Sequence, residues 1–171
     1  MNKIVIVGNV SSGKTTLANN LGTLLNIPVH HLDRIFWVEE KGIKQDVFIT
    51  QQEEMMRGEN WIIDGNFMRS KSYEMRLSRA DTIVYFDFSK IIIYWRLLKR
   101  FIKYFNKPRP DMGGNKRFHI DWHLIKFIWD YPAEEERSRV LQYSSTKNLI
   151  ILHNPKDEKR FLNTIVSRRV G

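Results

Sequence analysis

The chain has 171 residues, enough for one domain that buries a core without disulfides or a structural metal. It contains no cysteine, which excludes a disulfide framework and thiolate metal sites. The formal net charge of +9 at pH 7 favours anionic partners, among them ATP, nucleic acid and lipid headgroups, without distinguishing between them. No apolar run approaches the ~20 residues that span a bilayer, and the N-terminal run is too short for a signal peptide. We therefore expect a cytoplasmic protein without a membrane partner.

A glycine-rich segment, residues 8–15, follows an apolar run at residues 4–7 and precedes leucines that are spaced for a helix. It matches the P-loop pattern GxxxxGK(S/T) in the strand–loop–helix context that this motif requires. In such a loop, backbone N–H groups surround the β-phosphate, the lysine reaches the β- and γ-phosphates, and the next hydroxyl binds Mg²⁺. A glycine-rich turn without a ligand is the alternative, and a full match in this context disfavours it. The residues expected to bind ATP are Gly8, Asn9, Val10, Ser11, Ser12, Gly13, Lys14, Thr15 and Thr16, with Thr15 also a ligand of Mg²⁺.

Residues 27–33 predict a short second strand that ends at Asp33. In open parallel sheets, ligands bind beyond the carboxyl ends of the strands, so Asp33 is a candidate for the substrate side of the site. It could instead cap the segment that follows. Residues 34–60 then form an irregular insertion, in which Phe36 and Trp37 could line a substrate pocket, although packing is the favoured role for such rings.

Residues 61–66 predict a third strand that runs into Asp64 and a glycine. A carboxylate that ends a strand next to the P-loop strand can hold the water shell of Mg²⁺, so Asp64 is a candidate metal ligand. A plain Asp–Gly turn is the alternative. Arg69 follows closely and could contact a substrate phosphate, or it could be a solvated surface residue.

A short helix at residues 73–79 and a fourth strand at residues 81–87 come next. A long helix is then predicted at residues 89–105, with basic residues on one side, among them Arg96 and Arg100. Its other side is expected to be the buried face and consists of Ile92, Trp95, Leu98, Ile102 and Phe105.

Residues 106–120 contain two prolines and two glycines and predict an exposed loop that could serve as a lid. His119 and His123 have the spacing of a helical metal pair, but no third ligand is evident and a metal site is not favoured. Two further helices should follow, the second beginning at Pro132. A fifth strand at residues 148–153 is then followed by a helix with Asn154 as its cap.

Taken together, these motifs resemble the adenylate-kinase-like P-loop kinases. The resemblance rests on residues 8–15, 31–37, 61–66, 95–100 and 109–111. More narrowly, these residues resemble the bacterial DNA topology modulation (FlaR-like) proteins. It implies a three-layer α/β P-loop NTPase fold over residues 1–171, with a five-stranded parallel sheet of order 2-3-1-4-5, helices on both faces and a helical lid. It further implies that Arg96 and Arg100 act on the phosphates or the base, that Asn154 and Pro155 border the adenine, and that Asp33 faces the acceptor.

Two functions remain open at this stage. The first is an ATP- and Mg²⁺-dependent kinase for a small molecule, a nucleotide, nucleoside or other hydroxyl compound, in which Lys14, Asp33, Arg96 and Arg100 are catalytic. The second is a nucleotide-dependent regulator or a DNA-binding topology modulation protein, in which the basic, aromatic-rich stretch at residues 90–129 contacts nucleic acid. We favour the kinase because a kinase lid needs unpaired cations, and because the aromatic residues are expected on the buried face of the helix. Neither the acceptor, nor the oligomeric state, nor whether phosphate is transferred or ATP only hydrolysed follows from the sequence.

Overall fold

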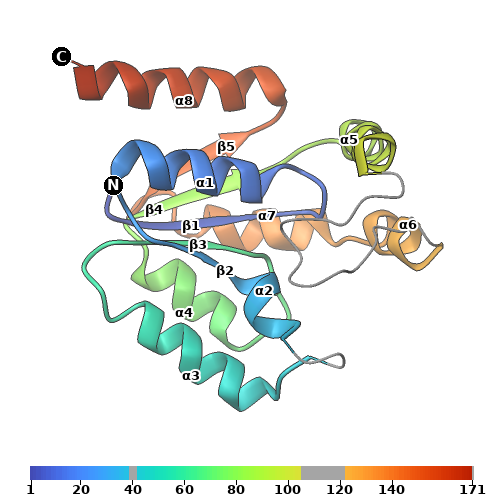
Figure 1. Ribbon diagram of the computed structural model, residues 1–171. Coiled ribbons are helices and arrows are strands. Elements are labelled where there is room, and N and C mark those ends of the chain that lie inside the picture. The colour runs from blue at the N-terminus through green and yellow to red at the C-terminus, as the bar shows by residue number, and fades with distance from the viewer. Residues whose placement is uncertain (39–41, 105–121, 171) are drawn as a thin grey trace.

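Five parallel strands form the central sheet, in the order β2-β3-β1-β4-β5. The structure, a computed structural model, describes residues 1–38, 42–104 and 122–170 (Figure 1). The strands are β1 (Lys3–Gly8), β2 (Val29–His31), β3 (Trp61–Asp64), β4 (Thr82–Phe86) and β5 (Asn148–Leu152). The predicted all-parallel sheet and its strand order are confirmed. The predicted lid, residues 106–120, lies outside the described residues, as does His119.

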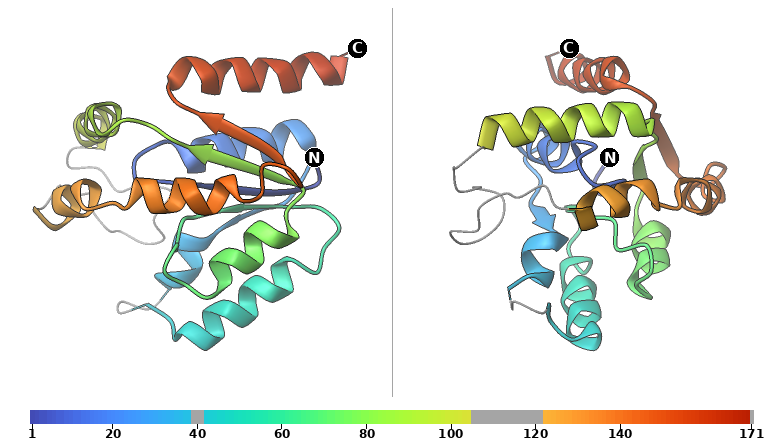
Figure 2. Two further views of the ribbon diagram at one scale, coloured as in Figure 1. Left: turned by 180° about the vertical axis from the view of Figure 1, so that it is seen from behind. Right: turned by 90° about the vertical axis from the view of Figure 1, so that its right-hand side faces the viewer.

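Helices cover both faces of this sheet, which gives the three predicted layers (Figures 1 and 2). One apolar core joins a sheet face to α1, α5, α6 and α8, and a second core joins the other face to α2, α3, α4 and α7. The helices are α1 (Lys14–Leu25), α2 (Leu32–Phe36), α3 (Gln45–Met55), α4 (Ser72–Arg79), α5 (Lys90–Tyr104), α6 (Trp122–Trp129), α7 (Ala133–Leu141) and α8 (Pro155–Val170).

The central position of β1 follows from its sequence. Residues 4–7 are all apolar and fully buried, because alternate side chains enter the two different cores. β1 pairs with β3 from Lys3↔Trp61 onward and with β4 as far as Gly8↔Phe86. The loops that follow β1, β2 and β3 therefore meet at one edge of the sheet.

The second strand is shorter than predicted. It ends at His31, and Leu32 begins the short helix α2, so Asp33 lies in the first turn of a helix and is exposed. An acidic side chain suits this position because the first turn of a helix carries a positive partial charge. Asp33 is therefore not the last residue of a strand, although it still follows the carboxyl end of β2.

The predicted buried face of α5 is wrong for three of its five residues, although Ile92 is partly buried against the core. Ile93 and Leu97 are 1% and 3% exposed, whereas Trp95, Leu98 and Ile102 are 57%, 45% and 67% exposed. α5 carries apolar residues on two sides, and helical periodicity alone does not tell which side packs on the sheet. Phe105, the fifth residue of the predicted face, lies outside the described residues. No helix in the described part of the chain has the length and hydrophobicity needed to cross a bilayer.

Candidate active site

The loop between β1 and α1 has the backbone shape of a phosphate cradle. Gly8 has φ 133°, Ser11 φ 59° and Gly13 φ 104°, all in the left-handed region. A Cβ atom on Gly8 would lie 2.8 Å from Cβ of Phe86 on β4, and one on Gly13 would collide with the guanidinium of Arg96. Both positions therefore require glycine for conformation and for space. Successive N–H groups in such a loop form an anion-binding concavity that ends at a helix N-terminus.

Polar side chains of this loop are placed to receive an anion. The Nζ atom of Lys14 donates to the carbonyl of Asn9 at 2.8 Å, so its ammonium group is folded onto the loop itself. Asn9 is buried, and its Oδ1 accepts from the N–H of Val10 at 2.7 Å. The hydroxyl oxygens of Ser11 and Ser12 are buried and have no hydrogen-bond partner among the described residues. Buried hydroxyl groups without partners at a loop of this shape fit a phosphate group well.

Asp64 lies at the carboxyl end of β3, beside β1, and is 4% exposed. Its Oδ2 atom lies 2.9 Å from Nδ1 of His31, the last residue of the neighbouring strand β2. Nε2 of the same ring lies 3.0 Å from Oδ1 of Asn19 on α1. The chain Asp64–His31–Asn19 thus ties the candidate metal ligand to the helix that follows the P-loop.

The chemistry of these donors fits Mg²⁺ with few protein ligands. The described residues contain no group of three or more His, Asp or Glu side chains that could hold a metal ion. Mg²⁺ in phosphotransfer sites is bound through one or two protein oxygens, with phosphate and water as the remaining ligands. The hydroxyl of Thr15, in the first turn of α1, and the carboxylate of Asp64 are the residues that would hold it.

Arg96 reaches the P-loop from α5. Its guanidinium donates to the carbonyl of Ser12, pairs with Oε2 of Glu158 at 2.7 Å, and lies 4.7 Å from the ring centroid of Phe88. Glu158 comes from the first turn of α8, so this ion pair connects α5, α8 and the P-loop. Arg100 lies one turn further along α5 and is half-buried.

The residues predicted for the substrate side are spread over two segments. Phe36 packs at 4.9 Å against Trp37, at 5.1 Å against Phe48 and at 5.1 Å against Phe67, measured between ring centroids. This aromatic cluster accounts for Phe36 by packing, while Trp37 remains 47% exposed. Arg69 is also exposed, in the loop after β3.

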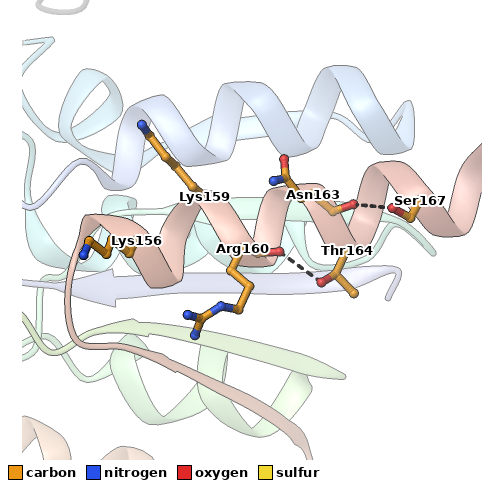
Figure 3. A pocket seen from close by; sticks show the side chains of 6 residues that line it. All are labelled: Lys156, Lys159, Arg160, Asn163, Thr164 and Ser167. Atoms are coloured by element: carbon orange, nitrogen blue, oxygen red, sulfur yellow. Dashed lines mark hydrogen bonds between the residues drawn. The ribbon is translucent and has the colours of Figure 1, made fainter.

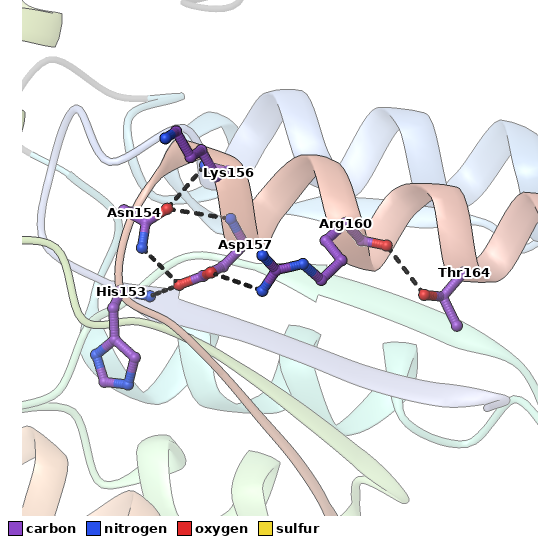
Figure 4. A network of polar contacts seen from close by, with 6 residues as sticks. All are labelled: His153, Asn154, Lys156, Asp157, Arg160 and Thr164. Atoms are coloured by element: carbon purple, nitrogen blue, oxygen red, sulfur yellow. Dashed lines mark hydrogen bonds and ion pairs between the residues drawn. The ribbon is translucent and has the colours of Figure 1, made fainter.

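Asn154 is the cap of α8, as expected. Its Oδ1 accepts from the N–H groups of Lys156 at 2.9 Å and Asp157 at 3.2 Å, while its Nδ2 donates to Oδ2 of Asp157 at 2.9 Å (Figure 4). Pro155 is the first residue of the helix. The turn is rigidly held, and its place beside an adenine ring stays a prediction.

A hollow on the described surface lies away from the P-loop. It is an open groove of about 670 Å³ along α8 (Figure 3). Two of its hydroxyl groups already donate within the helix, Thr164 to the carbonyl of Arg160 and Ser167 to the carbonyl of Asn163. This groove is formed by one exposed helix whose hydroxyl groups are already hydrogen-bonded. It is therefore a weaker candidate for the active site than the P-loop. It is lined by Lys156, Lys159, Arg160, Asn163, Thr164 and Ser167.

A buried polar network that the sequence did not reveal lies beneath the loop that follows β3. Glu136 of α7 is fully buried and accepts hydrogen bonds from the hydroxyl groups of Tyr73, at 3.0 Å, and Tyr131. The Tyr131 hydroxyl in turn accepts from Nδ2 of Asn66 at 2.7 Å. Arg76, also fully buried, donates to the carbonyls of Gly65 at 2.7 Å and Asn66 at 2.6 Å. The backbone just after Asp64 is thus held by charged groups from α4 and α7.

Burial sets the protonation of this network. It raises the pKa of Glu136 to about 7, although the Tyr73 hydrogen bond and the charges of Lys14, Arg76 and Arg139 act in the opposite direction. Burial also lowers the pKa of Arg76 to about 10, which leaves this guanidinium charged at neutral pH. The influence of Lys14 on Glu136 links the network electrostatically to the P-loop.

Solved structures of similar fold are small-molecule kinases. A shikimate kinase from Acinetobacter baumannii in complex with shikimate is 16% identical, with a TM-score of 0.58 and coverage of 99% of this chain and 93% of that chain. A deoxyadenosine kinase from M. mycoides is 13% identical, with a TM-score of 0.55 and coverage of 98% and 97%. A gluconokinase from Sinorhizobium meliloti 1021 is 11% identical, with a TM-score of 0.56 and coverage of 99% and 95%. No protein-family profile matches the chain, and neither does any curated protein.

These likenesses define the class of the fold. The chain has the fold of these P-loop kinases, and the predicted three-layer fold with its five-stranded parallel sheet is confirmed, while the predicted lid lies outside the described residues. The narrower resemblance to DNA topology modulation proteins is not supported by these structures and stays a prediction. So do the roles assigned to individual residues of the site.

Proposed function

We propose that the protein transfers the γ-phosphate of ATP to a hydroxyl group of a small molecule. One observation carries the proposal: a P-loop with buried, unpartnered serine hydroxyls lies at the same sheet edge as the buried carboxylate of Asp64. The fold supports it, since its solved neighbours include a shikimate kinase, a deoxyadenosine kinase and a gluconokinase. A nucleotide, a nucleoside or another hydroxyl compound is the proposed acceptor.

In the proposed reaction, the acceptor oxygen attacks the γ-phosphorus, the bond to the β,γ-bridging oxygen breaks, and ADP leaves. Lys14 would leave the carbonyl of Asn9 and neutralise charge on the β- and γ-phosphates. Asp33 would orient the acceptor and take its proton. Thr15 and Asp64 would hold Mg²⁺, which would neutralise phosphate charge when bound. Arg96 and Arg100 would stabilise the transferring phosphate from α5.

A screen for ADP release tests the proposal directly. The full chain is incubated with MgATP and a panel of nucleosides, nucleotides, sugars and small hydroxy acids, with Lys14→Ala as the catalytic control. We expect acceptor-dependent ADP release in the wild type and none in Lys14→Ala. ADP release that does not depend on an acceptor and is lost in Lys14→Ala would instead make the protein an ATPase switch. Failure of the wild type to bind ATP would overturn both readings.

Asp33→Asn separates the acceptor side from the ATP side. We expect this variant to bind ATP with nearly unchanged affinity and to lose phosphate transfer, because Asp33 is exposed on α2 and not part of the P-loop. Asp46→Asn is the matched control, since Asp46 also lies exposed in the first turn of a helix. A large loss of ATP affinity in Asp33→Asn would reassign Asp33 to the metal site.

A further inference from the structure

The outer side of α5 carries a continuous apolar stripe. Ile91, Trp95, Leu98 and Ile102 follow one another at intervals of one helical turn and are 82%, 57%, 45% and 67% exposed. They extend over ~16 Å of helix. The right-hand view of Figure 2 shows α5 in front, at the surface of the molecule. Exposed apolar residues that are contiguous, rather than scattered, indicate an interaction surface.

This stripe is not needed to hold α5 on the protein. The opposite side of the helix already places Ile93 and Leu97 in the core that contains β1 and α1. The Tyr94 hydroxyl also donates to the carbonyl of Ile125, which joins α5 to α6. Because these contacts already hold α5 on the protein, its outer side is left uncovered by the described residues.

Basic residues flank the stripe, and α5 itself contains no acidic residue. Lys99 and Lys103 are exposed and one turn apart, and the Nζ atom of Lys99 lies 5.1 Å from the ring centroid of Trp95. α5 contains five Lys and Arg residues and no Asp or Glu. In the sequence, Asp87 and Asp111 are the nearest acids on either side. The partner of this face should therefore be apolar and anionic.

We propose that the outer face of α5 docks onto an anionic lipid bilayer, with the helix lying in the plane of the headgroups. An amphipathic helix of this kind buries its apolar face ~5–10 Å into the boundary between headgroups and acyl chains, while its lysines stay at the level of the phosphates. This proposal departs from the expectation of no membrane partner, which rested on the lack of a spanning segment; a surface helix needs none.

Two other occupants fit less well. A second copy of the chain would bring two α5 helices together, each with the exposed Lys99 and Lys103 beside the stripe, and like charges would oppose that contact. Nucleic acid would gain from stacking on rings, but three of the four stripe residues are aliphatic and offer no ring face to a base. Aliphatic side chains do gain by entering acyl chains. The proposal does not depend on ATP binding or on phosphate transfer.

Vesicle co-sedimentation with the full chain tests the proposal. We expect the protein to sediment with vesicles of phosphatidylcholine containing about one third phosphatidylglycerol, to stay in solution with phosphatidylcholine alone, and to be released as salt is raised. The double variant Trp95→Ala/Ile102→Ser should bind at least about tenfold more weakly. Lys99→Gln/Lys103→Gln should bind about 30-fold more weakly, since each lysine near an anionic surface contributes about fivefold.

Matched controls lie on and beside α3, which Figure 1 places away from α5. Val47→Ser removes an exposed apolar side chain, and Lys44→Gln/Arg57→Gln removes two exposed cations. Both should bind vesicles as the wild type does, and all variants should keep the wild-type melting temperature because the altered residues are exposed. Equal binding by stripe and control variants would overturn the proposal, as would no binding to the anionic vesicles. It would also be overturned if the stripe variant abolished dimerisation or single-stranded DNA binding instead.

Discussion

His31 holds Asp64 from the neighbouring strand: the Nδ1 atom of the imidazole lies 2.9 Å from Oδ2 of the carboxylate. The other ring nitrogen lies 3.0 Å from Asn19 on α1, so the ring is fixed at both ends. One carboxylate oxygen is thereby engaged, and Oδ1 is the oxygen left to face a metal or its water. His31 thus acts on the proposed Mg²⁺ site through Asp64 and not by direct contact.

We expect His31→Ala to lower the affinity for Mg²⁺ by about tenfold or more, because residues that orient metal ligands contribute on that scale. The measurement is a Mg²⁺ titration of ATP binding by calorimetry, which needs no acceptor. His30→Ala is the control, since His30 is the preceding residue and has no contact with Asp64 in the described hydrogen bonds. Equal Mg²⁺ dependence in the wild type and His31→Ala would show that the ring does not orient Asp64.

Glu158 pairs with Arg96, the side chain that we propose for the transferring phosphate. The ion pair at 2.7 Å is largely shielded from solvent, with side chains 23% and 13% exposed, and it draws the guanidinium toward α8. We expect Glu158→Gln to bind ATP about three- to tenfold more tightly, because Arg96 then becomes available and one negative charge near the polyphosphate is lost. Glu54→Gln removes the same charge from an exposed site on α3 and should leave ATP affinity unchanged. Weaker ATP binding in Glu158→Gln would contradict this expectation.

The pKa of Glu136 predicts a pH-dependent stability. Burial raises this pKa from 4.5 to about 7 in the folded protein, so Glu136 stabilises the fold below pH 4.5 and the benefit is lost as pH rises through 7. Glu136→Gln cannot ionise and should lack this loss. As pH rises from acidic to mildly alkaline, the wild type should lose about 3 kcal/mol of unfolding free energy that the variant keeps. Urea denaturation of both proteins at a series of pH values checks this. A difference that stays constant with pH would mean that Glu136 titrates normally.

Arg76 is expected to be essential for stability. Its guanidinium is fully buried and hydrogen-bonded to the carbonyls of Gly65 and Asn66. Its positive charge also stabilises the carboxylate of Glu136. Arg76→Met should lose about 3 to 5 kcal/mol, because two buried carbonyls and a buried carboxylate are left without their cation. For a chain of this length, Tm should fall by about 10 °C. Arg79→Met, an exposed change on the same helix, should leave Tm almost unchanged.

The local features of the site could be predicted from sequence, and the contacts between distant segments could not. The P-loop and the strand that ends at Asp64 are short motifs whose residues adopt their shape from neighbours in the chain. The partners of Asp64 and Arg96 are different, because His31 and Glu158 reach them only through the strand order and the return of α8. A histidine next to a strand end gives no signal of which carboxylate it will meet.

α5 shows a second limit of sequence reasoning. Apolar residues occupy two sides of this helix, and the prediction chose the side of Trp95 where the fold uses that of Ile93 and Leu97. That error also removes one argument against nucleic acid, since Trp95 and Trp129 are exposed after all. A helix with one apolar side would have been assigned correctly, because only one face could then be buried.

The central position of β1 has a consequence for the order in which the protein folds. The strand that leads into the P-loop precedes its hydrogen-bond partners in the chain, which lie at residues 61–64 and 82–86. Pairings of such long sequence separation form late, because large loops must close before they are made. ATP should therefore bind only to a chain that has already assembled β3, β1 and β4, and the nucleotide would then shift the folding equilibrium of the whole domain by mass action. Nucleotide added during refolding would therefore stabilise the assembled sheet without helping it to form.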